Sequence, residues 1–346
     1  MNTILDNYHS PFLGQLKNRI VMSAMTRGFA SEKHLCTHDI LEYYERRAKD
    51  GIGLIITEGI IIHPSADGYN RVPHLYTNEQ AKEWKKVTDA VHNHNTKIFA
   101  QLWHCGRISH SDFTNGETIV SSTNKPAEGI NRQNNKPFGT PRALKTDEIP
   151  MIYDMFMNSA DKAFDAGFDG VEIHMGHGYL IDQFLDSRIN DRNDKYGGSI
   201  ENRCRIALEL TEQLLKKFGP NKILLRLSPS RMMGGLYEWP ELDDMINYLF
   251  SELEKLGLRL IDISCANADY HQTSGKSIRK IRKLWKHTII GGASLSVASA
   301  NSEIRDGYLD LVTWGRAILA NPDFVTKLKE LKPLQTMTDE MRTILY

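Results

Sequence analysis

The chain has 346 residues, and its 43 lysine and arginine side chains balance 43 aspartate and glutamate side chains. A neutral chain has no long-range field that would draw it to nucleic acid or to an anionic membrane surface. The sequence also lacks the run of about 18 uncharged apolar residues that a membrane-spanning helix requires. We therefore expect a globular protein with a small-molecule partner, and with neither nucleic acid nor a membrane as partner.

The N-terminal stretch and the cysteines give no sign of export. Residues 1–20, MNTILDNYHSPFLGQLKNRI, lack the basic segment, apolar stretch and cleavage site of a signal peptide, which predicts a cytoplasmic protein. Cys36, Cys105, Cys204 and Cys265 lie far apart and show no CxxC spacing. This pattern argues against a disulfide framework, a structural zinc site and an iron–sulfur cluster, so we expect reduced thiols and no metal.

Short apolar runs rich in β-branched residues recur along the whole chain and are typical of buried strands. Amphipathic, charged segments with helical periodicity separate many of them, as at residues 78–95, 150–167, 201–219 and 241–257. The eight runs are RIVMSAM (19–25), GLIITEGIII (53–62), KIFAQLW (97–103), GVEIHM (170–175), KILLRLS (222–228), LRLIDIS (258–264), HTIIGG (287–292) and LDLVTWG (309–315).

Eight strands with interposed helices indicate a closed parallel barrel, and we predict a single (β/α)8 TIM barrel domain over residues 1–346. An open doubly wound sheet would give a similar alternation, but no GxGxxG sequence follows the first strand. The polar stretch 109–144 predicts a long loop after the third strand, and such a loop lies over the site of a barrel. We also expect Ser199 to cap the helix that follows it, and Asn321 to cap the last helix with Pro322 in its first position.

Polar residues and glycines occur at the C-terminal ends of the predicted strands, where barrel enzymes hold their reactive groups. Glycines after strands seven and eight, beside an arginine, are typical of a phosphate site. An amide on strand three and a guanidinium on strand five suit a planar heteroaromatic imide that becomes anionic when reduced, which fits flavin. These strand-end residues are Ala24, Met25, Thr26 and Arg27; Glu58 and Gly59; Gln101, Trp103 and His104; His174 and His177; Arg226 and Ser228; Gly291 and Gly292; and Gly315 and Arg316.

The stretch VEIHMGHGYL, residues 171–180, ends the fourth strand with two imidazoles and a phenol. Three interpretations of His174 and His177 stay open: buried polar groups with satisfied hydrogen bonds, ligands of a metal ion, or two donors to one carbonyl oxygen. A zinc site needs three or four ligands, and no third ligand is evident nearby in the sequence. In the third interpretation, Tyr179 would donate a proton to a neighbouring carbon.

Residues 174–205, HMGHGYLIDQFLDSRINDRNDKYGGSIENRCR, closely resemble a long and specific motif of the Old Yellow Enzyme family. Members of that family are flavin-dependent ene-reductases on a (β/α)8 barrel. The resemblance covers nearly the whole chain, in the expected order. It extends over FLGQLKNRIVMSAMTR (12–27), GLIITEG (53–59), QLWHCGR (101–107), LRLSP (225–229) and LDLVTWGRAILANPDF (309–324).

The resemblance implies two sets of contacts to a tightly but non-covalently bound FMN. One set would line the flavin ring and bind its polar edge: Ala24, Met25, Thr26, Gly59, Gln101 and Arg226. The other set would hold the phosphate: Gly291, Gly292, Gly315 and Arg316.

The resemblance also implies the substrate contacts. His174 and His177 would bind the carbonyl oxygen of the substrate. Tyr179 would protonate the carbon next to that carbonyl, and Trp103 and Tyr69 would shape the substrate pocket.

The implied activity is that of an FMN-dependent ene-reductase that oxidises NADPH or NADH. It would reduce the C=C bond of an α,β-unsaturated carbonyl or related activated alkene by ping-pong hydride transfer through flavin N5. Three alternatives stay open: a flavin-binding sensor or scaffold with a silent site, a related barrel flavoprotein dehydrogenase, and a flavin-free isomerase of sugar phosphates. The oligomeric state, monomer or homo-oligomer, also stays open.

Overall fold

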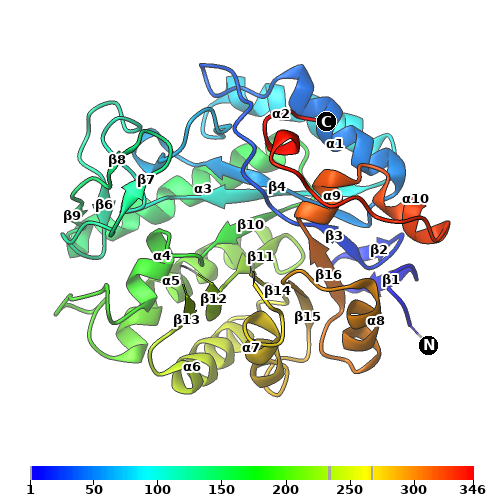
Figure 1. The fold of residues 1–346 in the computed structure, drawn as a ribbon. Helices are drawn as coiled ribbons and strands as arrows, with labels where there is room; N and C mark the ends of the chain where they lie inside the picture. Colours follow the sequence, from blue (N-terminus) through cyan, green and yellow to red (C-terminus); the bar gives the residue numbers. More distant parts are fainter. Residues whose placement is uncertain (1, 233–234, 266–267) are drawn as a thin grey trace.

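Eight parallel strands close into a barrel in the computed structural model, which describes residues 2–232, 235–265 and 268–346 (Figure 1). Neighbouring strands follow the chain order, and the eighth strand pairs with the first, so that residues 312–314 lie beside residues 20–22. This closure confirms the predicted barrel and excludes the open sheet. The barrel strands are β3 (Ile20–Met22), β4 (Leu54–Ile61), β5 (Lys97–Trp103), β10 (Gly170–His174), β11 (Ile223–Arg226), β14 (Leu260–Ser264), β15 (Thr288–Gly292) and β16 (Leu311–Trp314).

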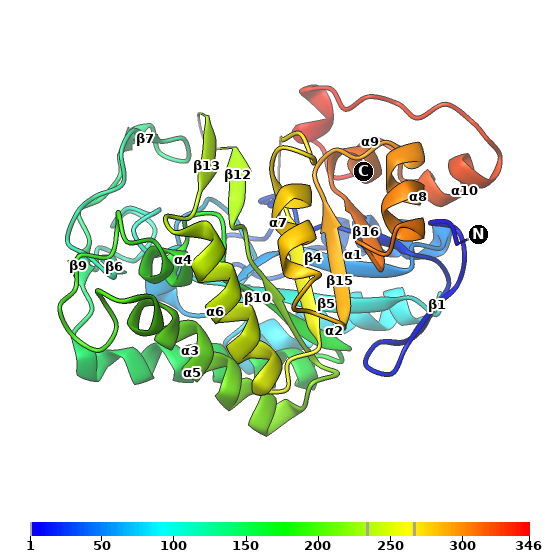
Figure 2. The same cartoon turned by 90° about the horizontal axis from the view of Figure 1, so that it is seen from below.

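Helices surround the strands in both views of the fold (Figures 1 and 2). Sequence signals set several of their ends: Thr77 and Gln80 form a capping box, and Ser199 Oγ accepts the Asn202 N–H as predicted. No helix within the described ranges is long and apolar enough to cross a membrane. The helices are α1 (His38–Asp50), α2 (Asn78–His92), α3 (Ile149–Asp165), α4 (Leu180–Leu185), α5 (Ile200–Phe218), α6 (Leu242–Lys255), α7 (Ser274–Ile281), α8 (Val297–Arg305), α9 (Arg316–Ala320) and α10 (Phe324–Lys329), with 3-10 turns η1 (Pro64–Ala66), η2 (Thr146–Glu148) and η3 (Glu340–Arg342).

An N-terminal hairpin closes the lower end of the barrel. Strands β1 (Tyr8–Ser10) and β2 (Gly14–Leu16) pair antiparallel, and Leu13 and Leu16 pack with apolar side chains from the barrel strands. The Tyr8 hydroxyl also hydrogen-bonds to Thr288 Oγ1 at 2.9 Å. Since apolar side chains fill this end, we expect the ligand site at the C-terminal ends of the strands, where barrel sites lie.

The predicted long loop after the third strand is confirmed, but it contains short strand pairs. Strands β6 (Val120–Ser121) and β9 (Arg142–Ala143) pair in parallel, and β7 (Ile130–Asn131) and β8 (Lys136–Pro137) pair antiparallel. Figure 1 shows these strands together at one side of the barrel. Strands β12 (Ser230–Met232) and β13 (Leu236–Glu238), which follow the fifth barrel strand, also pair antiparallel.

The predicted cap of the last helix is wrong. Helix α10 begins at Phe324, and the side chain of Asn321 does not accept from its first turn. Asn321 instead donates to the Ala317 carbonyl at 2.8 Å and accepts the Gln335 N–H at 2.8 Å. Its amide therefore ends α9 and binds the C-terminal segment, so it is not available as an N-cap.

A carboxylate from α1 takes over the capping of α10. Asp50 accepts the N–H groups of Val325 at 2.6 Å and Thr326 at 3.1 Å. We expect Asp50→Ala to lower the free energy of unfolding by about 1 kcal/mol, because two N–H groups at a helix start lose their acceptor. Urea unfolding measures this loss, with the exposed neighbour Lys49→Ala as control. An equal loss in both variants would contradict the capping role.

Candidate active site

The predicted substrate-binding side chains come together at the C-terminal ends of β4, β5 and β10. The ring centroid of Trp103 lies 4.6 Å from that of Tyr69 and 4.7 Å from that of Tyr179. The rings of His174 and His177 are 5.3 Å apart, and His174 lies 5.0 Å from Tyr179. Five residues from three separate segments of the sequence thus form one cluster.

A tight turn after β10 presents the two imidazoles. His177 has a left-handed backbone with φ 57°, and its N–H donates to Ser228 Oγ at 2.6 Å. Gly176 permits this approach, because a Cβ there would meet Ser228 Oγ at 2.7 Å. Gly178 has φ 82°, and its N–H donates to Asp182 Oδ2 at 2.7 Å. The two glycines of HMGHGY are therefore required by the turn that carries His177.

Both imidazoles are neutral. Burial, and then the charge of Arg226, lower the pKa of His174 and that of His177 well below the usual value. His174 Nδ1 and both ring nitrogens of His177 find no hydrogen-bond partner among the described residues. Buried polar groups are normally paired, so the interpretation of satisfied, purely structural histidines does not hold. These nitrogens are available to a ligand.

The Tyr179 phenol is held protonated beside them. Its hydroxyl lies 2.7 Å from that of Tyr69, and burial, followed by the proximity of Tyr69, raises the pKa of Tyr179 well above 10. Burial likewise raises the pKa of Tyr69 to about 12. Asp67 fixes this partner: its Oδ1 accepts the Tyr69 N–H at 3.0 Å, and its Oδ2 pairs with His74 Nε2 at 2.9 Å. Asp67 lies in a loop, so no periodic pattern in the sequence points to it.

Metal ligation does not fit the two site histidines. Within the described ranges, the one group of three His, Cys, Asp or Glu side chains with clustered ligand atoms is His34, Asp67 and His74, not His174 and His177. In that group the imidazoles of His34 and His74 are stacked at 3.7 Å with an interplanar angle of 11°. Parallel rings cannot direct two in-plane lone pairs at one ion. We therefore infer that these residues stabilise the loop that contains Tyr69.

A polar layer lies inside the barrel below the cluster. Gln101 Nε2 donates to Glu172 Oε1 at 2.7 Å, and Arg226 Nε lies 3.8 Å from Asp262 Oδ2. All four side chains are buried, and Arg226 Nε, Glu172 Oε2 and Asp262 Oδ1 find no hydrogen-bond partner among the described residues. Glu172 and Asp262 are not among the predicted site residues. Their one signal in the sequence is a carboxylate inside an otherwise apolar strand.

A β-bulge in β4 positions the segment after β3 that contains Thr26. Strand β4 shifts register against β5 between Ile56 and Gly59, which brings Glu58 Oε2 to the N–H groups of Arg27, at 2.9 Å, and Gly28, at 3.1 Å. Glu58 therefore fixes the segment that follows Ala24, Met25 and Thr26, of which Thr26 is exposed. A Cβ on Gly59 would meet the Trp103 ring at 2.3 Å, so Gly59 is required for packing within the chain as well.

The predicted phosphate residues also lie close together. A Cβ on Gly292 would meet the Thr313 carbonyl at 2.4 Å, and one on Gly315 would meet Met25 Sδ at 2.8 Å. The exposed Arg316 donates to Ser294 Oγ at 2.9 Å, which places its guanidinium beside the segment after β15. The ends of β15, β16 and β3 are thus joined around these glycines. Gly291 lies one residue earlier and is buried against Leu309.

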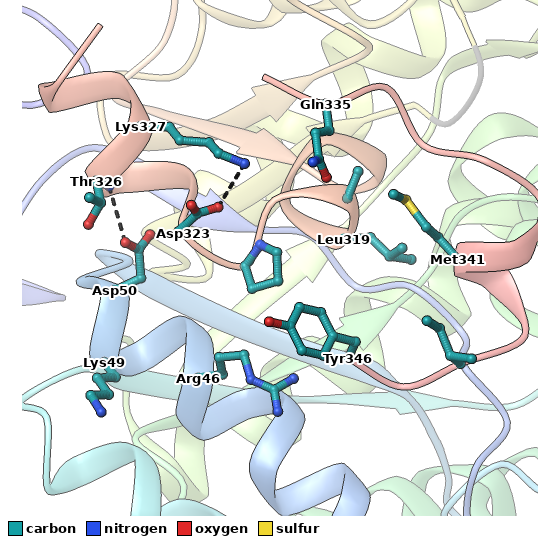
Figure 3. Close-up of a pocket in the computed structure, with 13 residues that line it drawn as sticks. Arg46, Lys49, Asp50, Leu319, Asp323, Thr326, Lys327, Gln335, Met341 and Tyr346 are labelled. Atoms are coloured by element: carbon teal, nitrogen blue, oxygen red, sulfur yellow. Dashed lines mark hydrogen bonds and ion pairs between the residues drawn. The ribbon is translucent and has the colours of Figure 1, made fainter. Parts of the chain in front are cut away.

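A cavity of about 690 Å³ lies elsewhere, between α1, the α9–α10 segment and the C-terminal residues (Figure 3). None of the predicted site residues lines it. Three of its charged groups have partners: Lys327 pairs with Asp323 at 3.0 Å, and Asp50 caps α10. Next to it, Arg27 donates to the carbonyl of Ile344 at 2.6 Å and so holds the C-terminal segment against the segment after β3.

Comparison with known proteins identifies the family of the chain. Residues 13–335 match the NADH:flavin oxidoreductase / NADH oxidase family. The chain belongs to this family. It is 38% identical over 333 residues to putative 12-oxophytodienoate reductase 11 of Oryza sativa subsp. japonica, covering 94% of this chain and 90% of the relative. It is 39% identical over 323 residues to putative 12-oxophytodienoate reductase-like protein 1 of Arabidopsis thaliana, covering 92% and 98%.

A solved structure supports the same assignment. The Old Yellow Enzyme homologue from Zymomonas mobilis superposes with a TM-score of 0.91 at 30% identity, covering 99% of this chain and 97% of that one. As a member of the NADH:flavin oxidoreductase family, the chain is an NAD(P)H-dependent flavin oxidoreductase with FMN as cofactor. The residues present fit this cofactor, because the buried guanidinium of Arg226 has an Nε without a hydrogen-bond partner among the described residues.

Glu58 makes the free energy of unfolding depend on pH. Burial raises the pKa of Glu58 from 4.5 to about 7, although the Arg27 and Gly28 N–H groups oppose this rise. The folded protein therefore binds a proton more tightly than the unfolded chain, and this stabilisation is full below pH 4.5 and is lost as the pH rises through about 7. Each pH unit within that window corresponds to at most about 1.4 kcal/mol.

We expect Glu58→Gln to remove this dependence, since the amide oxygen still accepts hydrogen bonds but does not ionise. Relative to the unsubstituted protein, the variant should gain stability between about pH 5 and pH 8 in urea unfolding. Glu212→Gln, at an exposed position of α5, is the matched control. Parallel stability profiles for Glu58→Gln and the unsubstituted protein would show that Glu58 does not titrate in this range.

Proposed function

We propose that the chain reduces the C=C bond of α,β-unsaturated carbonyl compounds at the cluster of His174, His177 and Tyr179. The observation that carries this proposal is the set of unpartnered nitrogens on two neutral histidines beside a protonated phenol. Two neutral imidazoles can each donate one N–H to a carbonyl oxygen, where negative charge develops during hydride addition to the β-carbon. The relatives' names support the substrate class, because 12-oxophytodienoate contains both a ketone and C=C bonds.

When bound, FMN would supply hydride transfer from NADPH or NADH to the alkene. Gln101 and Arg226 bind the polar edge of the ring, with Ala24, Met25, Thr26 and Gly59 along its sides. Gly291, Gly292, Gly315 and Arg316 hold the phosphate. Trp103 and Tyr69 bound the substrate space, and the Tyr69 hydroxyl keeps that of Tyr179 in place. We further propose that residues 1–346 act as one FMN-binding domain.

The experiment that tests this function starts from the purified protein. A flavin spectrum that NADPH or NADH bleaches anaerobically, and that cyclohexenone restores, is the expected result. A bleached protein that stays bleached in cyclohexenone would instead indicate the sensor or scaffold with a silent site. A colourless protein that binds no added FMN would contradict the cofactor assignment and favour the isomerase.

Substitution of Tyr179 and substitution of a site histidine should impair different steps of the reaction. Tyr179→Phe removes only the O–H, so flavin reduction by nicotinamide should stay nearly normal. Reoxidation by cyclohexenone should slow by roughly 10²–10⁴-fold, as for a lost general acid. Stopped-flow measurement of both half-reactions checks this, with Tyr76→Phe as a control at a tyrosine outside the cluster. Equal slowing of both half-reactions in Tyr179→Phe would contradict the role of proton donor.

His177→Ala should weaken ligand binding itself, because one of the two donors to the ligand oxygen is lost. A phenol titration reports this directly, since a phenolate bound over the flavin gives a long-wavelength charge-transfer band. We expect the band to need at least roughly tenfold more phenol, in line with one lost charge-assisted hydrogen bond. An unchanged titration curve would show that His177 does not contact the ligand.

A further inference from the structure

Two buried carboxyl groups face the same arginine from neighbouring strands. Glu172 on β10 and Asp262 on β14 are both 0% exposed, and β11, which carries Arg226, lies between them. In the strand register, Asp262 is directly opposite Arg226. One fixed positive charge therefore lies between two acidic groups that have no access to water.

The contacts of the two acids are incomplete if both are ionised. Glu172 accepts from Gln101 Nε2 at 2.7 Å and Asp262 from Ser264 Oγ at 3.1 Å, but Glu172 Oε2 and Asp262 Oδ1 have no donor among the described residues. The two carboxyl groups are nevertheless close enough to hydrogen-bond to each other. Such a bond needs a proton on one of them, and one shared proton leaves a single negative charge to balance Arg226.

Burial, and then the charge of Asp262, raise the pKa of Glu172 well above its usual value, which makes Glu172 the better proton acceptor. The other groups near the pair are the uncharged amide of Gln101 on β5, the guanidinium of Arg226 on β11, and His174 on β10, which stays neutral because burial lowers its pKa. The shared proton is thus the one exchangeable charge in the described part of this layer.

We propose that Glu172 and Asp262 form a redox-linked proton site. The pair would hold its shared proton more tightly when the flavin beside Arg226 is reduced, because hydride uptake adds one negative charge to the ring. This inference rests on the proposed placement of FMN against Gln101 and Arg226. Hydride uptake adds two electrons and one proton to the ring and leaves one more negative charge in the site. Arg226 then shares its positive charge between that ring and the acid pair, and the pair compensates by binding a proton from solvent.

The charges balance in both directions. A nicotinamide gives up a hydride and becomes its oxidised cation, and the acid pair gains up to one solvent proton for each FMN reduced. When the hydride leaves for the alkene, the pair returns its proton to solvent, while Tyr179 supplies the proton that the substrate carbon receives and takes up one proton from solvent in its place. Glu172 and Asp262 are therefore positioning residues that set the charge around Arg226 and do not touch the substrate.

The midpoint potential of bound FMN as a function of pH tests the inference. One proton per two electrons gives about 29.6 mV per pH unit, and a second proton gives about 59 mV per pH unit. We expect the steeper slope over part of the range from about pH 5 to pH 9 in the unsubstituted protein. Glu172→Gln should follow the shallow slope throughout, because the amide cannot bind the proton.

Glu58→Gln is the matched control, since it also converts a buried carboxyl to an amide beside the proposed flavin site, and this carboxyl accepts from the N–H groups of Arg27 and Gly28. It should keep the steep segment. Loss of that segment in Glu58→Gln, or identical slopes in Glu172→Gln and the unsubstituted protein, would overturn the proposal. If Glu172→Gln does not retain FMN, Asp262→Asn removes the other half of the pair and should give the same shallow slope.

A second readout needs no variant. Reduction by NADPH takes no solvent proton into the ring, so any uptake seen with a pH indicator in weak buffer comes from the protein. Uptake should appear at the pH of the steep segment, and its absence from about pH 5 to pH 9 would overturn the inference. If the protein turns over cyclohexenone without proton uptake, the inference alone fails. If it takes up protons but is not reoxidised by enones, the proposed substrate class alone fails, and a protein that binds no FMN contradicts both.

Discussion

Arg226 places a permanent positive charge inside the barrel, with 6% of its surface exposed and Asp262 at 3.8 Å. A buried guanidinium is costly unless acidic groups and hydrogen bonds surround it, so the neighbouring strands have to supply negative charge. Asp262 and Glu172 do so from either side. The unpartnered Nε of Arg226 shows that the protein alone does not use its full hydrogen-bonding capacity. An anionic ring edge would complete it.

The same charge sets the state of the residues above it. Arg226 is the largest charged contribution to the lowered pKa of His174 and of His177, after burial itself. Neutral imidazoles donate through one nitrogen each, which is what a carbonyl oxygen requires without adding a second cation to the site. Contacts from the loops position these side chains. Ser228 holds the His177 backbone, and Asp67 holds the backbone of Tyr69, whose hydroxyl contacts Tyr179.

The barrel was predictable because each of its strands is a buried apolar run, and a parallel barrel needs such runs. The site was predictable as far as residues follow strand ends or match the family motif, as His174, His177 and Tyr179 do. Asp67 and His74 were not, because loop contacts leave no periodic pattern. Glu172 and Asp262 are visible as acids within apolar strands, yet only closure of the barrel places both beside Arg226. Asn321 was misjudged because its partner, Gln335, is 14 residues away.

One comparison tests whether the charge of Arg226 stabilises a negative charge on the reduced cofactor. The midpoint potential of bound FMN is measured in the unsubstituted protein, in Arg226→Lys and in Arg226→Met. We expect Arg226→Met to make FMN harder to reduce, with a clearly more negative potential, and Arg226→Lys to retain most of the original value because it keeps the charge. Equal potentials in Arg226→Met and the unsubstituted protein, at equal FMN content, would contradict it.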